Sequence, residues 1–190
     1  MYEVEIKVPA AIEAVRARLV AEETSAERRG AELQRDVYYD APHREFAETD
    51  EALRIRHVTP LSDGMGSEPA GETETVMTYK GPLIDDASKT REEHETDVSD
   101  AEATAGIFDG LGFIPAATVN KEREFWTLDG VTVTLDVVKD VGEFVEVELS
   151  VPDEADVDEA RERAVTVLDR IGLDADDQVR TSYLGLLCSR

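Results

Sequence analysis

The residues of this sequence that could do chemistry are charged residues spaced two apart. The chain begins with Glu3, Glu5 and Lys7 alternating with the apolar residues Val4 and Ile6. Successive side chains of a β-strand leave the backbone on opposite faces. The opening stretch therefore predicts a strand with one apolar face and one face that carries two carboxylates and an ammonium group.

The same spacing recurs along the chain in pairs of like charge. The pairs are Arg54 with Arg56, Glu93 with Glu95, Lys121 with Arg123, and Glu146 with Glu148, while Lys80, Arg91 and Asp136 share the parity of charged or polar neighbours. For a single strand, a solvated face is the simpler interpretation, because antiparallel sheets often face water on one side. In a chain with so many acids, however, bases sorted into pure pairs favour a cavity lined by charge.

Such a cavity has a specific chemistry. Carboxylates gathered on one wall repel each other unless a cation joins them, and their hard oxygens suit Mg²⁺ or Mn²⁺. Arginine and lysine on a facing wall bind a polyanion, and guanidinium groups match phosphate oxygens well. The pattern predicts a metal–phosphate site, with phosphoryl or nucleotidyl transfer as its chemistry.

Strands must position these residues, and the alternation predicts eight of them. The expected strands cover residues 1–9, 33–40, 51–58, 74–82, 90–98, 117–128, 131–138 and 144–151. The dipeptide Asp129-Gly130 is typical of a hairpin turn, and Gly81-Pro82 is expected to end the fourth strand. Eight strands can close into a barrel with a side-chain-lined interior. We therefore expect an α+β fold, namely a closed or nearly closed antiparallel eight-stranded β-barrel with flanking helices.

The intervening segments are predicted as helices or loops. Helices are expected at residues 10–20, 100–111 and 157–171, with a last short helix in the tail 181–190. The polar stretch 21–30 is expected to be a loop or frayed helix. The turn-rich stretch 59–72 is expected to be a long hairpin loop or a mobile flap.

Length and charge narrow the class of protein. The chain has 190 residues, which fits one domain over 1–190, and it carries 44 acids against 20 bases, a net charge of −24. That charge disfavours nucleic acid and anionic membranes as partners, and an acid-rich, lysine-poor surface is typical of salt-loving microbes. No apolar run could cross a bilayer, no secretion signal is evident, and Cys188 is the single cysteine, so a cytoplasmic location is expected. The sequence leaves open whether the chain forms a homodimer.

A series of motifs in order along nearly the whole chain resembles the CYTH family of triphosphate tunnel enzymes. The motifs are ExExK at Glu3, Glu5 and Lys7, then DVYYD, LRIR, TYKGP, REEHE, LGF, NKERE, TLDVV, GEFVEVEL and SYLGLL. KGP, LGF and GxFVExE are most similar to the class IV, or CyaB-like, adenylate cyclase branch. Thiamine triphosphatases and inorganic triphosphatases share the same tunnel.

The resemblance implies a role for each charged position. A divalent metal, Mg²⁺ or Mn²⁺, would lie on Glu3, Glu5, Asp136, Glu146 and Glu148. A triphosphate would be gripped by Lys7, Arg54, Arg56, Lys80, Arg91, Lys121 and Arg123. Lys7, Glu93 and Glu95 are the expected catalytic residues.

Three functions are compatible with these residues. The first is cyclisation of ATP to 3′,5′-cyclic AMP and pyrophosphate. The second is hydrolysis of an inorganic, thiamine or nucleoside triphosphate in the same tunnel, and the third is a non-catalytic module that binds polyphosphate or nucleotide. The choice between the two enzymes depends on which phosphorus atom lies beside the nucleophile, and spacing does not reveal that.

Several residues that could act as general bases, metal ligands or stacking partners are better explained as structural. His43, His57 and His94 lack metal-ligand spacing, and the parity of His94 is opposite to that of the neighbouring glutamates. The strand aromatics, Tyr38, Tyr39 and Trp126, are expected in the core. Tyr183 is expected to serve in helix packing.

Overall fold

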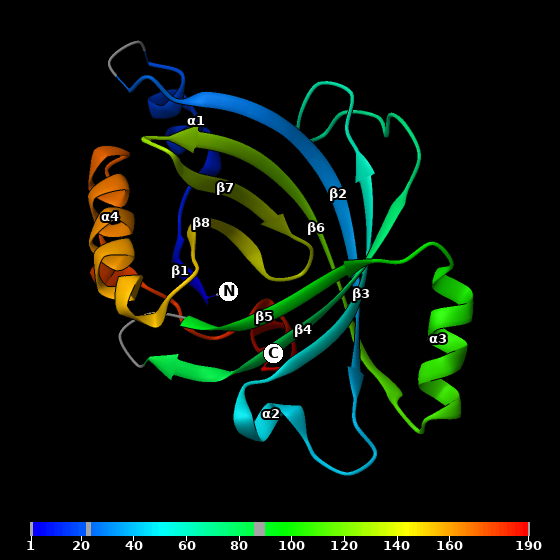
Figure 1. The fold of residues 1–190 in the computed structure, drawn as a ribbon. Helices are drawn as coiled ribbons and strands as arrows, with labels where there is room; N and C mark the ends of the chain where they lie inside the picture. The colour runs from blue at the N-terminus through cyan, green and yellow to red at the C-terminus, as the bar shows by residue number, and fades with distance from the viewer. Residues whose placement is uncertain (1, 22–23, 86–89, 190) are drawn as a thin grey trace.

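Eight antiparallel strands form a closed barrel in the computed structural model, which describes residues 2–21, 24–85 and 90–189 (Figure 1). The strands are β1 (Tyr2–Pro9), β2 (Glu27–Asp40), β3 (Ala52–Pro60), β4 (Glu74–Asp85), β5 (Thr90–Asp97), β6 (Ile114–Leu128), β7 (Val131–Val138) and β8 (Gly142–Val151). Around the barrel they follow the order β1-β5-β4-β3-β2-β6-β7-β8. The predicted fold class is therefore confirmed.

Five α-helices in the described part of the chain flank the barrel. They are α1 (Ile12–Leu19), α2 (Phe46–Thr49), α3 (Ala101–Gly110), α4 (Val157–Arg170) and α5 (Tyr183–Cys188), with 3₁₀ turns at Glu154–Asp156 and Ala175–Asp177. The side chain of Asp100 caps α3 by accepting a hydrogen bond of 2.9 Å from the backbone N–H of Ala103. The short helix α2 and both 3₁₀ turns were not expected from the sequence. None of the described helices is long and apolar enough to cross a membrane.

Three strand boundaries differ from the prediction by three residues or more, and one of them is the start of β6 at Ile114 instead of residue 117. β2 begins at Glu27, inside the stretch predicted as a loop or frayed helix. β4 continues through Gly81-Pro82 to Asp85, because the register with β5 shifts between Lys80 and Leu83. A proline lacks the N–H of a regular ladder but is tolerated at such an irregularity.

The segment between β3 and β4 is a hairpin loop fastened to its neighbours. Leu61 and Pro69 form an isolated bridge across it. Arg28 of β2 donates a hydrogen bond of 2.6 Å to the carbonyl of Asp63, and the N–H of Gly66 donates to the carboxylate of Glu122 on β6. Of the two alternatives for this stretch, the structure has the long hairpin loop.

The main hydrophobic core lies outside the barrel. Val4, Ile6 and Val8 of β1 point outward, are at most 2% exposed, and belong to one apolar cluster with α1 and α4. In Figure 1, α4 lies along the outer side of this part of the sheet. Ile12, Val15 and Leu19 follow helical spacing and form the buried face of α1. With the apolar faces turned outward, the polar faces of the strands are left for the interior.

The remaining helices cover other parts of the barrel. Phe46 of α2 and Phe108 of α3 pack in a second cluster with Tyr39 and residues of β3. Tyr183 of α5 packs with Phe144 and other residues where β6, β7 and β8 meet the C-terminal segment. Asp129 and Gly130, which join β6 to β7, both have positive φ angles, as the predicted tight hairpin turn requires.

Candidate functional site

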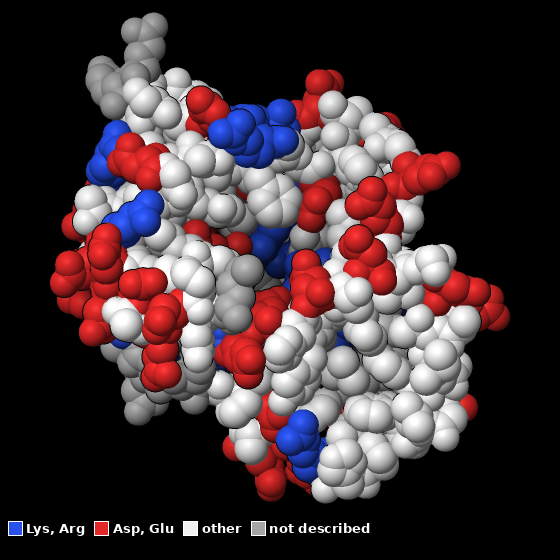
Figure 2. Space-filling view, in the orientation of Figure 1, with Lys and Arg blue, Asp and Glu red and all other residues white. Residues whose placement is uncertain are grey.

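The interior of the barrel holds a cavity of about 380 Å³ lined by the inward faces of the strands. Its lining includes seven of the chain's 20 lysines and arginines: Lys7, Arg54, Arg56, Lys80, Arg91, Lys121 and Arg123. Figure 2 shows lysine and arginine side chains deep in the central hollow, with acidic side chains around it on the surface. Bases are therefore concentrated in the interior of this strongly acidic protein, where ten acids of the same lining accompany them.

The predicted acidic residues also line this cavity, with one exception. Glu3, Glu5, Glu93, Glu95, Glu146 and Glu148 are in the lining. Asp136 is fully buried and lies behind it. His94 is on the outer face, with 65% of its side chain exposed, as its opposite parity predicts.

Three carboxylates come together on β1 and β8. Glu5, Glu146 and Glu148 offer oxygens that all lie within 4.8 Å of one another. The pKa of Glu148 is raised to about 8, mainly by burial and also by the nearby Glu3, Glu146 and Glu5, against the opposing effect of Arg123. A carboxyl group that resists ionisation beside two others is what a bound divalent cation would relieve, and hard oxygen ligands suit Mg²⁺ or Mn²⁺. The three residues fit such an ion.

Glu146 differs from Glu148 although both are buried. Burial opposes its ionisation, but Arg123, Lys121 and Lys7 together hold the pKa of Glu146 well below its usual range. In the β1–β8 register Lys7 lies directly opposite Glu146. The cluster therefore contains one firmly ionised carboxylate and one that holds a proton at neutral pH.

The other two expected metal residues are engaged by cations. Glu3 accepts a bond of 2.7 Å from Lys80, which also lies 2.7 Å from Glu93. Asp136 accepts hydrogen bonds from Arg123 at 2.7 Å and from Lys121 at 3.3 Å. Both residues lie outside the three-carboxylate cluster, so their part in metal binding stays a prediction.

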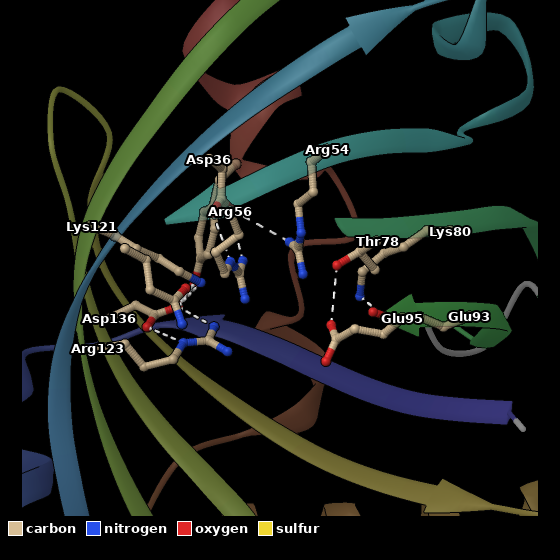
Figure 3. A network of polar contacts seen from close by, with 12 residues as sticks. Asp36, Arg54, Arg56, Thr78, Lys80, Glu93, Glu95, Lys121, Arg123 and Asp136 are labelled. Carbon is tan, nitrogen blue, oxygen red and sulfur yellow. Dashed lines mark hydrogen bonds and ion pairs between the residues drawn. The ribbon is translucent and has the colours of Figure 1, made fainter. Parts of the chain in front are cut away.

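The basic wall is organised by Asp36, as Figure 3 shows. Both Nε and Nη2 of Arg56 donate to its carboxylate at 2.7 Å, and Arg54 lies 3.5 Å away. Although burial favours the neutral acid, Arg56 and Arg54 hold the pKa of Asp36 well below its usual range. Nε of Arg54 is buried and has no hydrogen-bond acceptor among the described residues. Asp36 thus fixes two guanidinium groups and leaves a donor of Arg54 for a ligand.

Residues on β4 and β5 complete this wall. The hydroxyl of Thr78 donates a bond of 3.1 Å to Glu95. Nη2 of Arg91 donates a bond of 2.7 Å to the carboxylate of Asp50, in the turn after α2. The two glutamates expected to be catalytic therefore face the cavity, each beside a hydrogen-bond donor of β4.

Tyr183 packs in a core cluster, as predicted, and it also faces the cavity. Its hydroxyl donates a bond of 2.8 Å to Asp136, and its ring centroid lies 4.3 Å from Nζ of Lys7 and 5.0 Å from Nζ of Lys121. Lys7 further donates a bond of 2.7 Å to the carbonyl of Thr181. The C-terminal segment therefore contacts two of the expected phosphate-binding lysines. Burial, followed by Arg123, lowers the pKa of Lys121 to about 8.

Comparison with known proteins gives the family. Residues 1–183 match the CYTH domain. The chain belongs to the CYTH family. A curated relative from Methanocaldococcus jannaschii, named "Putative adenylate cyclase MJ0240", is 37% identical over 154 residues, which cover 81% of each chain.

Solved structures agree with this fold. PH1819 from Pyrococcus horikoshii OT3 superimposes with a TM-score of 0.86 at 37% identity and covers 98% of each chain. HpAC1 from Hippeastrum, described as having a dominant triphosphatase activity, superimposes with a TM-score of 0.60 at 16% identity and covers 99% of this chain and 95% of its own. The second likeness concerns the fold alone.

In this CYTH protein the two expected walls are distinguishable but not separate. Glu3, Glu5, Glu146 and Glu148 lie on the adjacent strands β1 and β8, and most of the bases lie on β3 to β6. Arg123 of β6 crosses this division, because its guanidinium contacts Asp136, Glu146 and Glu148. Buried bases and acids of the two walls thus neutralise one another through these ion pairs.

A second cavity adjoins the first at α5. It has a volume of about 970 Å³ and shares Tyr38, Asp50 and Ser182 with the barrel cavity. None of the residues expected to bind metal or phosphate lines it. The site chemistry of this CYTH protein is therefore assigned to the smaller, charged cavity.

Proposed function

We propose that this CYTH protein is a metal-dependent enzyme that converts ATP to 3′,5′-cyclic AMP and pyrophosphate. The observation that carries the proposal is the juxtaposition of the Glu5, Glu146 and Glu148 cluster with a wall of bases in one barrel cavity. The name of the relative from M. jannaschii supports the same reaction. Membership of the CYTH family makes the chain a triphosphate tunnel protein.

In the proposed reaction the 3′-hydroxyl of ATP attacks the α-phosphorus. The new oxygen–phosphorus bond closes the ring, the bond to the bridging oxygen breaks, and pyrophosphate leaves as the hydroxyl releases its proton. A divalent cation on the three glutamates would neutralise phosphate charge and lower the pKa of the attacking hydroxyl. Arg54, Arg56 and Lys121 would stabilise the charge that develops on the leaving pyrophosphate.

The expected catalytic residues have proposed positions in this reaction. Lys7 lies opposite Glu146 in the strand register, so it would bind phosphate next to the three-carboxylate cluster of Glu5, Glu146 and Glu148. Glu93 orients Lys80 for the triphosphate through the 2.7 Å contact. Glu95 lines the cavity beside Thr78 and would accept a proton or orient the substrate.

A triphosphatase is the second candidate. Here a water molecule attacks the terminal phosphorus of tripolyphosphate, thiamine triphosphate or a nucleoside triphosphate. HpAC1, which shares the fold, is described as having a dominant triphosphatase activity, and this supports hydrolysis as the second candidate reaction. The same metal cluster and the same bases would serve both reactions, so the site proposal is common to them.

Product analysis tests the proposal. The purified protein is incubated in high potassium chloride, which we propose suits its acidic exterior, with Mg²⁺ or Mn²⁺ and either ATP or tripolyphosphate. Phosphorus NMR and chromatography identify the products, and EDTA provides the control. Cyclic AMP and pyrophosphate would support the cyclase. Orthophosphate without cyclisation would replace it with the triphosphatase, and binding without any product would favour a non-catalytic module.

A further inference from the structure

Gln34 presents an unused hydrogen-bond acceptor to the barrel cavity. Its side chain lies in the cavity lining and is 2% exposed. Its Nε2 donates to the carboxylate of Glu32, whereas its Oε1 is buried and has no donor among the described residues. The carboxylate fixes the orientation of the amide, because the flipped amide would place two oxygens against each other.

A phosphate chain cannot satisfy this acceptor. An ionised triphosphate offers oxygens that accept hydrogen bonds, and it has no N–H or O–H of its own. Leaving a buried acceptor unpaired costs about 1–3 kcal/mol. A ligand that pairs with Oε1 must therefore carry a hydroxyl or an amino group in addition to its phosphates.

The lining changes character around Gln34 on the neighbouring strands, whereas on β2 itself the next inward residue toward this end is the acid Glu32. Two residues beyond Arg56 the inward residue of β3 is Val58, and two residues beyond Arg123 that of β6 is Phe125. On β4 the corresponding step from Thr78 leads to Val76. Because β2 and β4 run antiparallel to β3, and β6 antiparallel to β2, these apolar residues lie toward one end of the cavity.

Gln34 marks the border between the basic and the apolar sections. In the sheet register it lies directly opposite Lys121 on one side and Val58 on the other. The apolar section also adjoins the three-carboxylate cluster. Arg123 links the two, because it contacts Glu146 and Glu148 and its Cζ lies 5.9 Å from the ring centroid of Phe125. Apolar side chains at this end suit a heterocycle and a sugar, with the α-phosphate next to the metal cluster.

We infer that Gln34 binds a hydroxyl or amino group of the nucleoside part of the substrate and thereby selects a nucleoside triphosphate over inorganic triphosphate. The inference rests on the proposed function, because it takes the basic section as the triphosphate site. It places the nucleoside among Val58, Val76 and Phe125. A site of this kind rejects a ligand without the donor, because the acceptor is then left unpaired.

The test compares two non-hydrolysable ligands by calorimetry in the presence of Mg²⁺. They are the analogue of ATP with methylene groups in place of both the α,β and the β,γ bridging oxygens, and the bis-methylene analogue of inorganic triphosphate. Gln34→Leu should raise the Kd for the nucleotide analogue about tenfold and change that for the inorganic analogue by less than about twofold. Gln178→Leu is the matched control, because Gln178 also has a buried unpaired amide atom but lines the second cavity. It should leave the ratio of the two Kd values unchanged.

Equal losses for both ligands, or no loss for the nucleotide, would overturn the inference. Thermal melts of both variants show whether a common loss comes from misfolding, and Gln34→Asn then serves as the milder variant. Inosine and 2′-deoxyadenosine analogues identify the bound group, because the analogue that lacks it should lose no further affinity in Gln34→Leu. The Kd ratio decides the inference even if ATP is bound and never turned over, an outcome that would defeat only the proposed reaction.

Discussion

The two faces of β1 and β8 bury opposite kinds of side chain within one sheet. Outward, Val4, Ile6 and Val147 are at most 2% exposed beneath α1 and α4. Inward, the same strands carry Glu5, Lys7, Glu146 and Glu148. Each fully buried aliphatic side chain contributes about 1.5–3 kcal/mol to folding, whereas buried ions lose hydration that their partners only partly replace. The outer face therefore holds the fold together, and the inner face holds charges in place for a ligand.

The sharpest test of this division is Glu146→Gln. The variant keeps the size of the side chain but removes one carboxylate from the Glu5, Glu146 and Glu148 cluster proposed to bind the metal, so we expect turnover to fall by about 100-fold or more. Some binding of triphosphate should persist because the basic wall is intact. Turnover is measured with Mg²⁺ by phosphorus NMR.

Glu122→Gln is the control for that variant. Glu122 lies on β6 with its carboxylate bonded to Gly66 of the hairpin loop, outside the cavity lining. The same chemical change there should leave turnover within about twofold. Normal turnover in Glu146→Gln would contradict the assignment of the metal cluster.

The outer face should show the opposite response in Leu168→Ala. Leu168 is fully buried in α4, so its truncation should lower the free energy of unfolding by about 2–5 kcal/mol. Catalysis per folded molecule should not change, because the helix lies outside the barrel. Urea titration and activity at a temperature where the variant is folded check this. Normal stability with low activity in this variant would contradict the assignment of stability to the outer face and ligand binding to the inner face.

Glu148, on the inner face, should make the free energy of unfolding depend on pH. Its pKa is raised from 4.5 to about 8, first by burial. Between these values the folded protein holds a proton that the unfolded chain releases, so this group makes unfolding easier as pH rises. The slope reaches about 1.4 kcal/mol per pH unit and ends above about pH 8. Glu148→Gln should remove this contribution, which urea titrations in EDTA would show as a difference in slope from the wild type.

The same proton should oppose metal binding. A divalent cation must displace it, so Mg²⁺ affinity should rise with pH up to about 8 and then level off. Calorimetry over this range measures the effect. A metal affinity independent of pH would place the ion elsewhere.

The smallest expected effect is that of Lys7→Ala. Loss of one ammonium group from the cavity should raise KM for the triphosphate about tenfold, with a smaller change in kcat. Lys139→Ala is the matched control, because Lys139 is exposed and lies outside the cavity lining. An unchanged KM in Lys7→Ala would show that this lysine does not contact the substrate.

Alternation in the sequence was sufficient to predict which residues face inward. A strand admits two faces only, so fixing Val4 and Ile6 as apolar places Glu5 and Lys7 together on the other side. The same logic correctly separated His94 from its neighbouring glutamates, and the number of strands indicated closure of the barrel. These features depend on local geometry, which the sequence contains directly.

Contacts between residues of different strands and helices could not be predicted in this way. Parity places Asp36 inside, but only the β2–β3 register brings it opposite Arg56. Tyr183 lies on a six-residue helix, and its contact with Asp136 depends on where the C-terminal segment returns to the barrel. For β4, a proline that would end a regular strand falls at a register shift, which depends on the pairing with β5.

The position of the phosphate-binding candidates beneath an acidic surface also affects how fast a substrate arrives. With a net charge of −24, the field outside the protein repels a polyanion until it reaches the entrance, while it attracts divalent cations. Salt screens this repulsion, with a Debye length of about 3 Å at 1 M against about 10 Å at 0.1 M. The rate constant for nucleotide association should therefore rise with potassium chloride, whereas enzymes with an attractive exterior slow down. An organism with a salty interior would supply this screening continuously, so fast capture of substrate would depend on its surroundings as much as on the site.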